Sequence, residues 1–246
     1  MRITRSAIST TFCIFAEIMP MSNRKFPVIS TLNRFSLTGI LFLLLFLFSE
    51  SITAQSIRGE LITGLNLAQV DGDEVVGYRK PGFNGGVGAA LPIGGQWTIS
   101  IETLFSQKGA YKKYPLEYID SLGLPYYNLR LNYAEIPFML HYNDKNKLIF
   151  GAGFSYGRLV DMTEIEHGLN KGWTTPNGPY NIGDWDIILD IRFRVFWRAY
   201  FNFRYSYSIV PIRERTYTSG VNTWTRKQYN NMLSFRLVFV FNEDIQ

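Results

Sequence analysis

Apolar and polar residues alternate along most of the chain after Gln55. In residues 185–195 (WDIILDIRFRV) every odd-numbered position is apolar, whereas the even-numbered positions include two aspartates and two arginines. Successive side chains of a β-strand point to opposite faces, so a period of two predicts a strand with one apolar and one polar face. The abundance of Ile, Val, Phe and Trp in this stretch also favours a strand.

The same pattern recurs seven more times. It predicts strands at residues 57–67, 83–93, 97–108, 127–142, 148–157, 185–195, 200–209 and 232–241. Within 127–142 the apolar positions change parity between Tyr133 and Ile136, and a one-residue slip is typical of a β-bulge. We expect this bulge near Ala134–Glu135, ahead of Pro137, which cannot donate a ladder hydrogen bond.

The connections between these strands alternate in length. Short ones fall at 93–96, 143–146 and 196–199, and long ones at about 69–82, 109–126, 160–183 and 210–227. Short turns at one rim and long loops at the other are typical of bacterial outer-membrane barrels. We therefore predict an all-β fold: an eight-stranded antiparallel up-and-down transmembrane β-barrel.

The composition decides which face of the strands points outward. Aromatic residues make up 16% of the chain and charged residues only 18%. The interior of an eight-stranded barrel is just wide enough for side chains to fill it, and the bulky aromatic face would crowd it. A soluble barrel with its apolar face inside is the alternative. We expect the apolar face to contact lipid and the Gly-, Ser- and Asn-rich face to line the lumen.

Two groups of residues follow from this orientation. Charges on the lumen face must be paired, since buried charges are costly without partners. We expect an interior charge network of Glu102, Asp186, Asp190, Arg192, Arg194, Arg204 and Arg236, joined by Lys108 and Glu135. Tyr and Trp favour membrane interfaces, which predicts aromatic girdles containing Trp97, Tyr142, Trp197 and Tyr200 at the short-turn rim and Tyr111, Tyr127, Tyr156, Trp185, Tyr207 and Tyr229 at the other.

The N-terminal region has the features of an export signal. A run of twelve apolar residues, LTGILFLLLFLF (37–48), follows Arg24, Lys25 and Arg34, as in a secretory signal peptide. It is short for a transmembrane helix, although an uncleaved anchor is the alternative. We predict a signal peptide over 1–54, with Met21 as an alternative start, and a barrel domain over 55–246.

The scarcity of Cys and His restricts the chemistry. One Cys and two His exclude a disulfide scaffold and a multi-histidine zinc centre, so we expect no metal or cofactor. The histidines, His141 near a short turn and His167 beside Glu164 and Glu166, are the candidates for acyl-transfer chemistry on lipid A. A cation site at Asp161, Glu164 and Glu166 lacks EF-hand spacing. No basic cluster indicates nucleic-acid binding.

Three segments resemble a known family. The stretches SIETLFSQKGAYKK (100–113), NYAEIPFMLHY (132–142) and FGAGFSYG (150–157) are similar, in the same order, to motifs of the PorT-like family of Bacteroidetes outer-membrane β-barrel domains. The resemblance implies an eight-stranded barrel without catalytic residues, and it allows a role in protein secretion through the type IX system. The conspicuous residues Gln107, Lys108, Gly109, Glu135 and Pro137 belong to these motifs.

The sequence thus predicts a protein of the Gram-negative outer membrane. The first hypothesis is a non-enzymatic barrel with a structural or partner-binding role, the second a PorT-like secretion accessory, and the third a lipid A acyl-modifying enzyme. The expected partners are outer-membrane lipid and lipopolysaccharide, the barrel-assembly machinery, and a secretion-system or extracellular partner. Eight strands are too few for a wide aqueous pore.

Overall fold

A computed structural model describes residues 56–242, apart from 74, 114–125 and 145–147. The predicted signal peptide over 1–54 and the alternative start Met21 lie outside the described residues. No helix in the described part of the chain is long and apolar enough to span a membrane.

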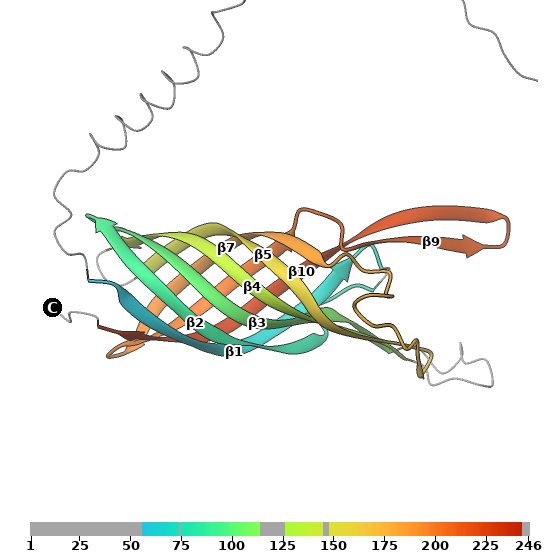
Figure 1. Cartoon of the computed structure of the whole chain (residues 1–246), viewed down its shortest axis with the longest axis horizontal. Helices are drawn as coiled ribbons and strands as arrows, with labels where there is room; N and C mark the ends of the chain where they lie inside the picture. Colours follow the sequence, from blue (N-terminus) through green and yellow to red (C-terminus); the bar gives the residue numbers. More distant parts are fainter. Residues whose placement is uncertain (1–55, 74, 114–125, 145–147, 243–246) are drawn as a thin grey trace, which may run out of the picture. The chain divides into compact units, whose positions relative to one another are not determined.

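Eight antiparallel strands close into a ring (Figure 1). Each strand pairs with its neighbours in the chain, and the ring closes where Gly59 pairs with Phe241 and Asp71 with Tyr229. The prediction of an eight-stranded antiparallel up-and-down barrel is confirmed. The strands of the ring are β1 (Arg58–Asp71), β2 (Lys80–Gly94), β3 (Trp97–Lys113), β4 (Tyr126–Asp144), β5 (Leu148–Glu166), β7 (Gly183–Phe196), β8 (Ala199–Ser208) and β10 (Asn222–Phe241).

The strands run further than the alternation predicts, because several continue into the expected loops. The two-residue strand β6 (Leu169–Asn170) pairs with the end of β5. Strand β9 (Arg213–Ser219) pairs with the first part of β10, from Asn222 to Gln228. The expected loop 210–227 is therefore mostly a β-hairpin that continues past the ring at its long-connection end (Figure 1).

The outer surface of the ring is apolar, as the alternation predicts. In β7, Ile187 is 52% and Leu189 55% exposed, whereas the intervening Ile188 is 2% exposed. The same contrast holds around the barrel. Exposed apolar residues on the other strands include Leu61, Leu65, Val87, Leu91, Ile101, Phe105, Phe138, Leu140, Phe150, Phe154, Phe235 and Leu237.

The predicted bulge in β4 is wrong. Odd-numbered residues face the lumen along the whole strand, so Leu129, Leu131 and Tyr133 are buried. What changes near Tyr133 is which face of the strand is apolar. Towards the long-connection end the lumen face is apolar, and towards the short turns the outer face is apolar. The irregularity of register lies in the pairing with β5, between Asn132 and Tyr133.

A cationic side chain in the middle of the apolar outer surface should destabilise the barrel. For Leu189→Arg we expect a loss of about 2–4 kcal/mol in the free energy of unfolding, because a lipid-facing arginine near the bilayer midplane is costly. Urea titration in lipid vesicles, followed by tryptophan fluorescence, measures this loss.

The matched control is Phe196→Arg at the short-turn end of the same strand, where the expected cost is about 0–1 kcal/mol. Equal effects of the two substitutions would contradict a lipid-facing belt.

Candidate functional site

The lumen contains two separate groups of buried charges. The first, here called the Glu102 cluster, comprises Glu60, Glu102, Asp190, Arg192, Arg204 and Arg236 and lies nearer the short turns. Glu102 of β3 is fully buried and accepts hydrogen bonds from three arginines on three other strands. The oxygen–nitrogen distances are 2.9 Å to Arg192, 2.8 Å to Arg204 and 3.0 Å to Arg236.

The other two acids complete the balance of charge. Asp190 lies 2.8 Å from Arg204, and Glu60 lies 2.7 Å from Arg192. Three carboxylates therefore face three guanidinium groups, and the side chain of Asn202 accepts a further bond from Arg236 at 2.8 Å. These pairs connect β1, β3, β7, β8 and β10 across the lumen, which fixes the cross-section of the barrel.

His141 borders this cluster. Its Nε2 lies 3.3 Å from Asp190, and its Nδ1 lies 3.4 Å from the hydroxyl of Ser100. A Cβ atom at Gly151 would come within 2.1 Å of Asp190 Oδ1 and 2.6 Å of the His141 ring. The glycine on β5 thus leaves the space that the histidine–aspartate contact occupies.

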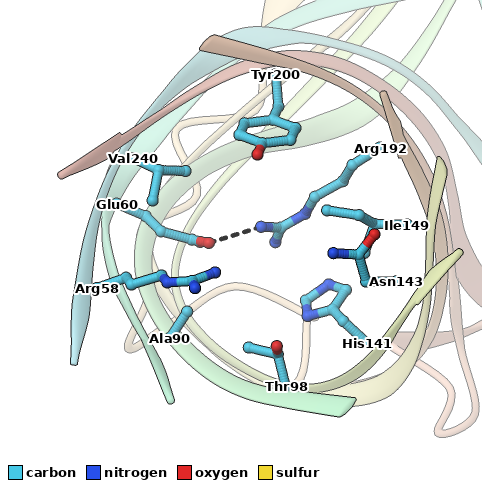
Figure 2. A pocket seen from close by; sticks show the side chains of 10 residues that line it. All are labelled: Arg58, Glu60, Ala90, Thr98, His141, Asn143, Ile149, Arg192, Tyr200 and Val240. Carbon is cyan, nitrogen blue, oxygen red and sulfur yellow. Dashed lines mark hydrogen bonds and ion pairs between the residues drawn. The ribbon is translucent and has the colours of Figure 1, made fainter. Parts of the chain in front are cut away.

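A cavity of about 50 Å³ opens beside this cluster at the short-turn end. Figure 2 shows the side chains of Arg58, Glu60, His141 and Tyr200 converging on it. The Tyr200 hydroxyl accepts hydrogen bonds from Arg194 at 2.6 and 3.1 Å. The cavity has room for a water molecule or two, which is too little for a conducting channel.

The second group, the Lys108 cluster, comprises Lys108, Glu135, Asp184 and Asp186. The lysine ammonium lies 2.8 Å from Glu135, 3.0 Å from Asp184 and 2.6 Å from Asp186. All four side chains are at most 5% exposed. The residues come from β3, β4 and β7, so this cluster also connects strands across the lumen.

An apolar layer separates the Lys108 cluster from the long-connection end. It includes Leu129, Leu131, Leu159 and Ile212, each at most 1% exposed. Above it, Arg213 donates to Glu164 at 3.0 Å and to the Tyr180 hydroxyl at 2.8 Å. The lumen is therefore filled in successive polar and apolar layers.

The β9–β10 hairpin is attached to the ring by ion pairs. Besides the Arg213–Glu164 pair, Arg215 lies 2.7 Å from Glu166, which also pairs with Lys171 at 2.9 Å. Burial alone would raise the pKa of the Glu166 carboxyl, but the hydrogen bonds from Arg215 and Lys171 outweigh it and hold the pKa below its usual range. The Glu166 carboxyl therefore stays ionised to a lower pH than an unpaired carboxyl would.

Asp73, in the connection between β1 and β2, is in the opposite situation. Burial is the main reason why the pKa of its carboxyl rises to about 7. The hydrogen bond from the amide of Val75 lowers the pKa in part, and the charge of the nearby Asp71 raises it further. The Val75 amide donates to Oδ1 at 2.8 Å, whereas Oδ2 is buried and has no hydrogen-bond partner among the described residues.

The predicted charge network is thus divided in the structure. Five of its members, Glu102, Asp190, Arg192, Arg204 and Arg236, lie together, while Asp186 belongs to the Lys108 cluster with Glu135. Arg194 bonds to Tyr200 near the short turns. Sequence reasoning missed Glu60 and Asp184, although both share the parity of the lumen-facing positions in their strands.

Several predicted girdle residues do lie at the rims. Trp97 and Tyr142 pack edge to face with ring centres 5.0 Å apart, as Tyr156 and Trp185 do in a tilted pair at 5.0 Å. Trp197 is exposed, and Tyr207 stacks on Tyr229 at 6.1 Å.

Two girdle predictions are wrong. Tyr200 is 5% and Tyr127 3% exposed, because both occupy lumen-facing positions. Their hydroxyls bond to lumen groups, Tyr200 to Arg194 and Tyr127 to Glu164.

The candidate catalytic and cation-binding residues do not assemble into a site. His167 is exposed in the β5–β6 turn, with a positive φ of 52°, while His141 lies inside the lumen. The acids Glu164 and Glu166 pair with Arg213 and Arg215, and Asp161 accepts from Asn132 at 2.9 Å. No group of three metal-ligating side chains is found among the residues the structure describes.

A comparison with protein-family models identifies the architecture. Residues 53–214 match the family described as outer membrane protein beta-barrel domain. The chain belongs to this family of outer-membrane β-barrels. Its place is the outer membrane, and the apolar outer surface of the barrel faces lipid. A search of curated proteins finds no match.

Several solved structures are similar to this chain over most of its length. Neisserial surface protein A is 10% identical over 74% of this chain and 97% of its own, with a TM-score of 0.46. Ail of Yersinia pestis is 10% identical over 75% of this chain and 98% of its own, with a TM-score of 0.43. AlkL is 15% identical over 80% and 98%, with a TM-score of 0.36.

Removing one arginine of the Glu102 cluster should destabilise this outer-membrane barrel. For Arg236→Met we expect a loss of about 3–5 kcal/mol in the free energy of unfolding, because a buried charge is left without its partner. Lys227→Met is the control, since Lys227 and Glu214 are 60% and 57% exposed and 3.7 Å apart. An exposed pair contributes only about 0–1 kcal/mol. Urea unfolding in lipid vesicles compares the two, and equal losses would refute the assignment.

The Asp73 carboxyl should titrate near neutral pH. Its pKa of about 7 in the folded state lies above the ordinary value of 3.8, so the folded protein binds this proton more tightly than the unfolded one. Asp73 therefore lowers stability as pH rises from 4 towards 7. Carbon-13 NMR of the labelled carboxyl measures the midpoint directly, and Asp73→Asn identifies its signal. A midpoint near 4 would show that the carboxyl is hydrated.

Proposed function

We propose that the protein is a closed, non-enzymatic outer-membrane barrel that binds a partner outside the cell. The single observation that carries this proposal is the contrast between its two parts. Two charge clusters and an apolar layer fill the lumen, whereas the β9–β10 hairpin continues past the ring (Figure 1). A filled lumen leaves no path for a solute to cross the membrane. Loops and hairpins on a rigid scaffold commonly bind partner molecules.

The hairpin has the features of a recognition element. Tyr217 and Trp224 stack across its strands at 6.1 Å, and Arg215 lies over the Tyr217 ring at 5.2 Å. Val221 at the turn is 100% exposed. The ion pairs of Arg213 and Arg215 with β5 hold the hairpin in a defined orientation, which lowers the entropy cost of binding.

Contacts with lipopolysaccharide are a further part of this proposal. Arg130 of β4 and Arg158 of β5 are exposed on the outer face. Arg130 lies beyond the apolar positions of its strand towards the long-connection end, and Arg158 lies beyond Tyr156 in the same direction. If this end faces the outside, as the short turns at the other end indicate, these guanidinium groups lie near the phosphates of the outer leaflet.

A role in type IX protein secretion is the second candidate. It is favoured by the resemblance of segments 100–113, 132–142 and 150–157 to PorT-like barrels. Deletion of the gene separates the two proposals: a partner-binding barrel leaves protein secretion normal, whereas a secretion accessory is required for it. An acyl-modifying enzyme would require accessible catalytic groups, and His141 is only 3% exposed.

Photo-crosslinking in intact cells tests partner binding. A photoreactive amino acid at Val221 should form an adduct with one defined protein or polysaccharide, whereas the same residue at Leu189 should capture lipid only. The purified barrel should also leave sugar-loaded vesicles impermeable. Adducts that do not differ between the two positions, or rapid sugar efflux, would contradict the proposal.

A further inference from the structure

The Lys108 cluster carries more negative than positive charge. One ammonium group faces the carboxylates of Glu135, Asp184 and Asp186 at 2.6–3.0 Å. If all four groups were ionised, the cluster would have a formal charge of −2. The Glu102 cluster shows the contrast, since its three carboxylates face three guanidinium groups.

Such an excess is costly at this place. The side chains of Lys108, Asp184 and Asp186 are at most 2% exposed, so water cannot screen the repulsion between the carboxylates. A buried charge without a partner costs several kcal/mol, and buried acids usually escape that cost by binding a proton.

The remaining neighbours are polar but neutral. The amide of Asn230 on β10 donates to Asp184 at 2.7 Å, and the hydroxyl of Ser208 on β8 lies 2.7 Å from Asp184 and 3.1 Å from Asp186. They supply hydrogen bonds without supplying charge. Within the described residues, Lys108 is the one cation that pairs with these three carboxylates.

Two buried hydroxyls lie beside the cluster, and that of Ser155 has no hydrogen-bond partner among the residues that the structure describes. Ser155 of β5 is fully buried and pairs in register with Asp186, so both side chains point into the lumen at the same level. Tyr133 of β4 is also fully buried, and Lys108 lies 5.0 Å from its ring centre. Unpartnered hydroxyl oxygens can accept a hydrogen bond, and a carboxyl group donates one only when it is protonated.

We propose that the Lys108 cluster is a proton-binding site that holds two protons on its carboxyl oxygens in the folded barrel. With two protons the cluster is neutral, and a protonated carboxyl can donate to the Ser155 hydroxyl. No group of ligands that could hold a metal ion is found in the described part of the chain.

The site makes the stability of the barrel depend on pH. In the unfolded chain these carboxyls lose their protons near pH 4, as ordinary acids do. The folded state binds up to two more protons above that pH, so stability falls as pH rises. For each proton held, the unfolding equilibrium constant should rise up to about tenfold per pH unit.

Amide substitutions test the proposal, because an amide has the shape of a neutral carboxyl. Asp184→Asn and Asp186→Asn should each reduce the pH dependence by up to about one proton and make the barrel more stable than the parent at pH 8.5. Urea unfolding is measured in lipid vesicles from pH 5 to 9. All variants carry Asp73→Asn, which removes the titration of that residue, and heat-modifiable gel migration confirms folding.

Glu102→Gln is the matched control. The same chemical change in the balanced cluster leaves three arginines with two acids, so this variant should be less stable at every pH, with an unchanged pH dependence. Lys108→Met should be stable only at lower pH than the parent, because its cluster needs a third proton to be neutral.

Two results would overturn the proposal. One is a loss of stability at pH 8.5 in both Asp184→Asn and Asp186→Asn, together with the full pH dependence of the parent. The other is a parent whose stability depends on sodium or potassium, relative to choline at equal ionic strength, and not on pH. That result would assign the positive charge to a bound metal cation.

Discussion

Neutral charge inside a narrow lumen is the constraint on which this structure depends. Eight strands enclose just enough space for side chains, and the lumen is polar because the opposite faces of the strands must contact lipid. Ionised groups in such a lumen have little water, so each needs a partner within hydrogen-bond distance. Glu102 satisfies this requirement, because it pairs with three arginines from three strands. The same ion pairs connect opposite strands across the lumen.

The layers of the lumen follow from the same constraint. Charged groups gather where partners from several strands meet, and apolar residues such as Leu129 and Leu131 fill the space between the Lys108 cluster and the long-connection end. A cavity of about 50 Å³ remains beside Arg58 and His141. A rigid, filled ring is a suitable base for the β9–β10 hairpin, whose arginines pair with acids at the end of β5.

Much of the fold was predictable because one period of two runs through the chain. Membrane-spanning strands of a narrow barrel have a single apolar face. Alternation, together with the bulk of the aromatic face, therefore assigned residues such as Leu189 to lipid and Asp190 to the lumen. The pattern misled where the lumen itself becomes apolar. Leu129, Leu131 and Tyr133 keep the parity of lumen positions, and the change of apolar face was mistaken for a bulge.

By itself, the sequence determined the number of barrel strands, their order, most of the lipid-facing residues and the pairing requirement of the lumen charges. Only the tertiary structure decided which charges meet. Register places Asp186 with Lys108, Arg236 with Glu102, and Tyr200 inside the lumen instead of at the rim. The physical reason is that alternation specifies the face of each strand, whereas contacts across the lumen depend on strand stagger, a property of the closed ring.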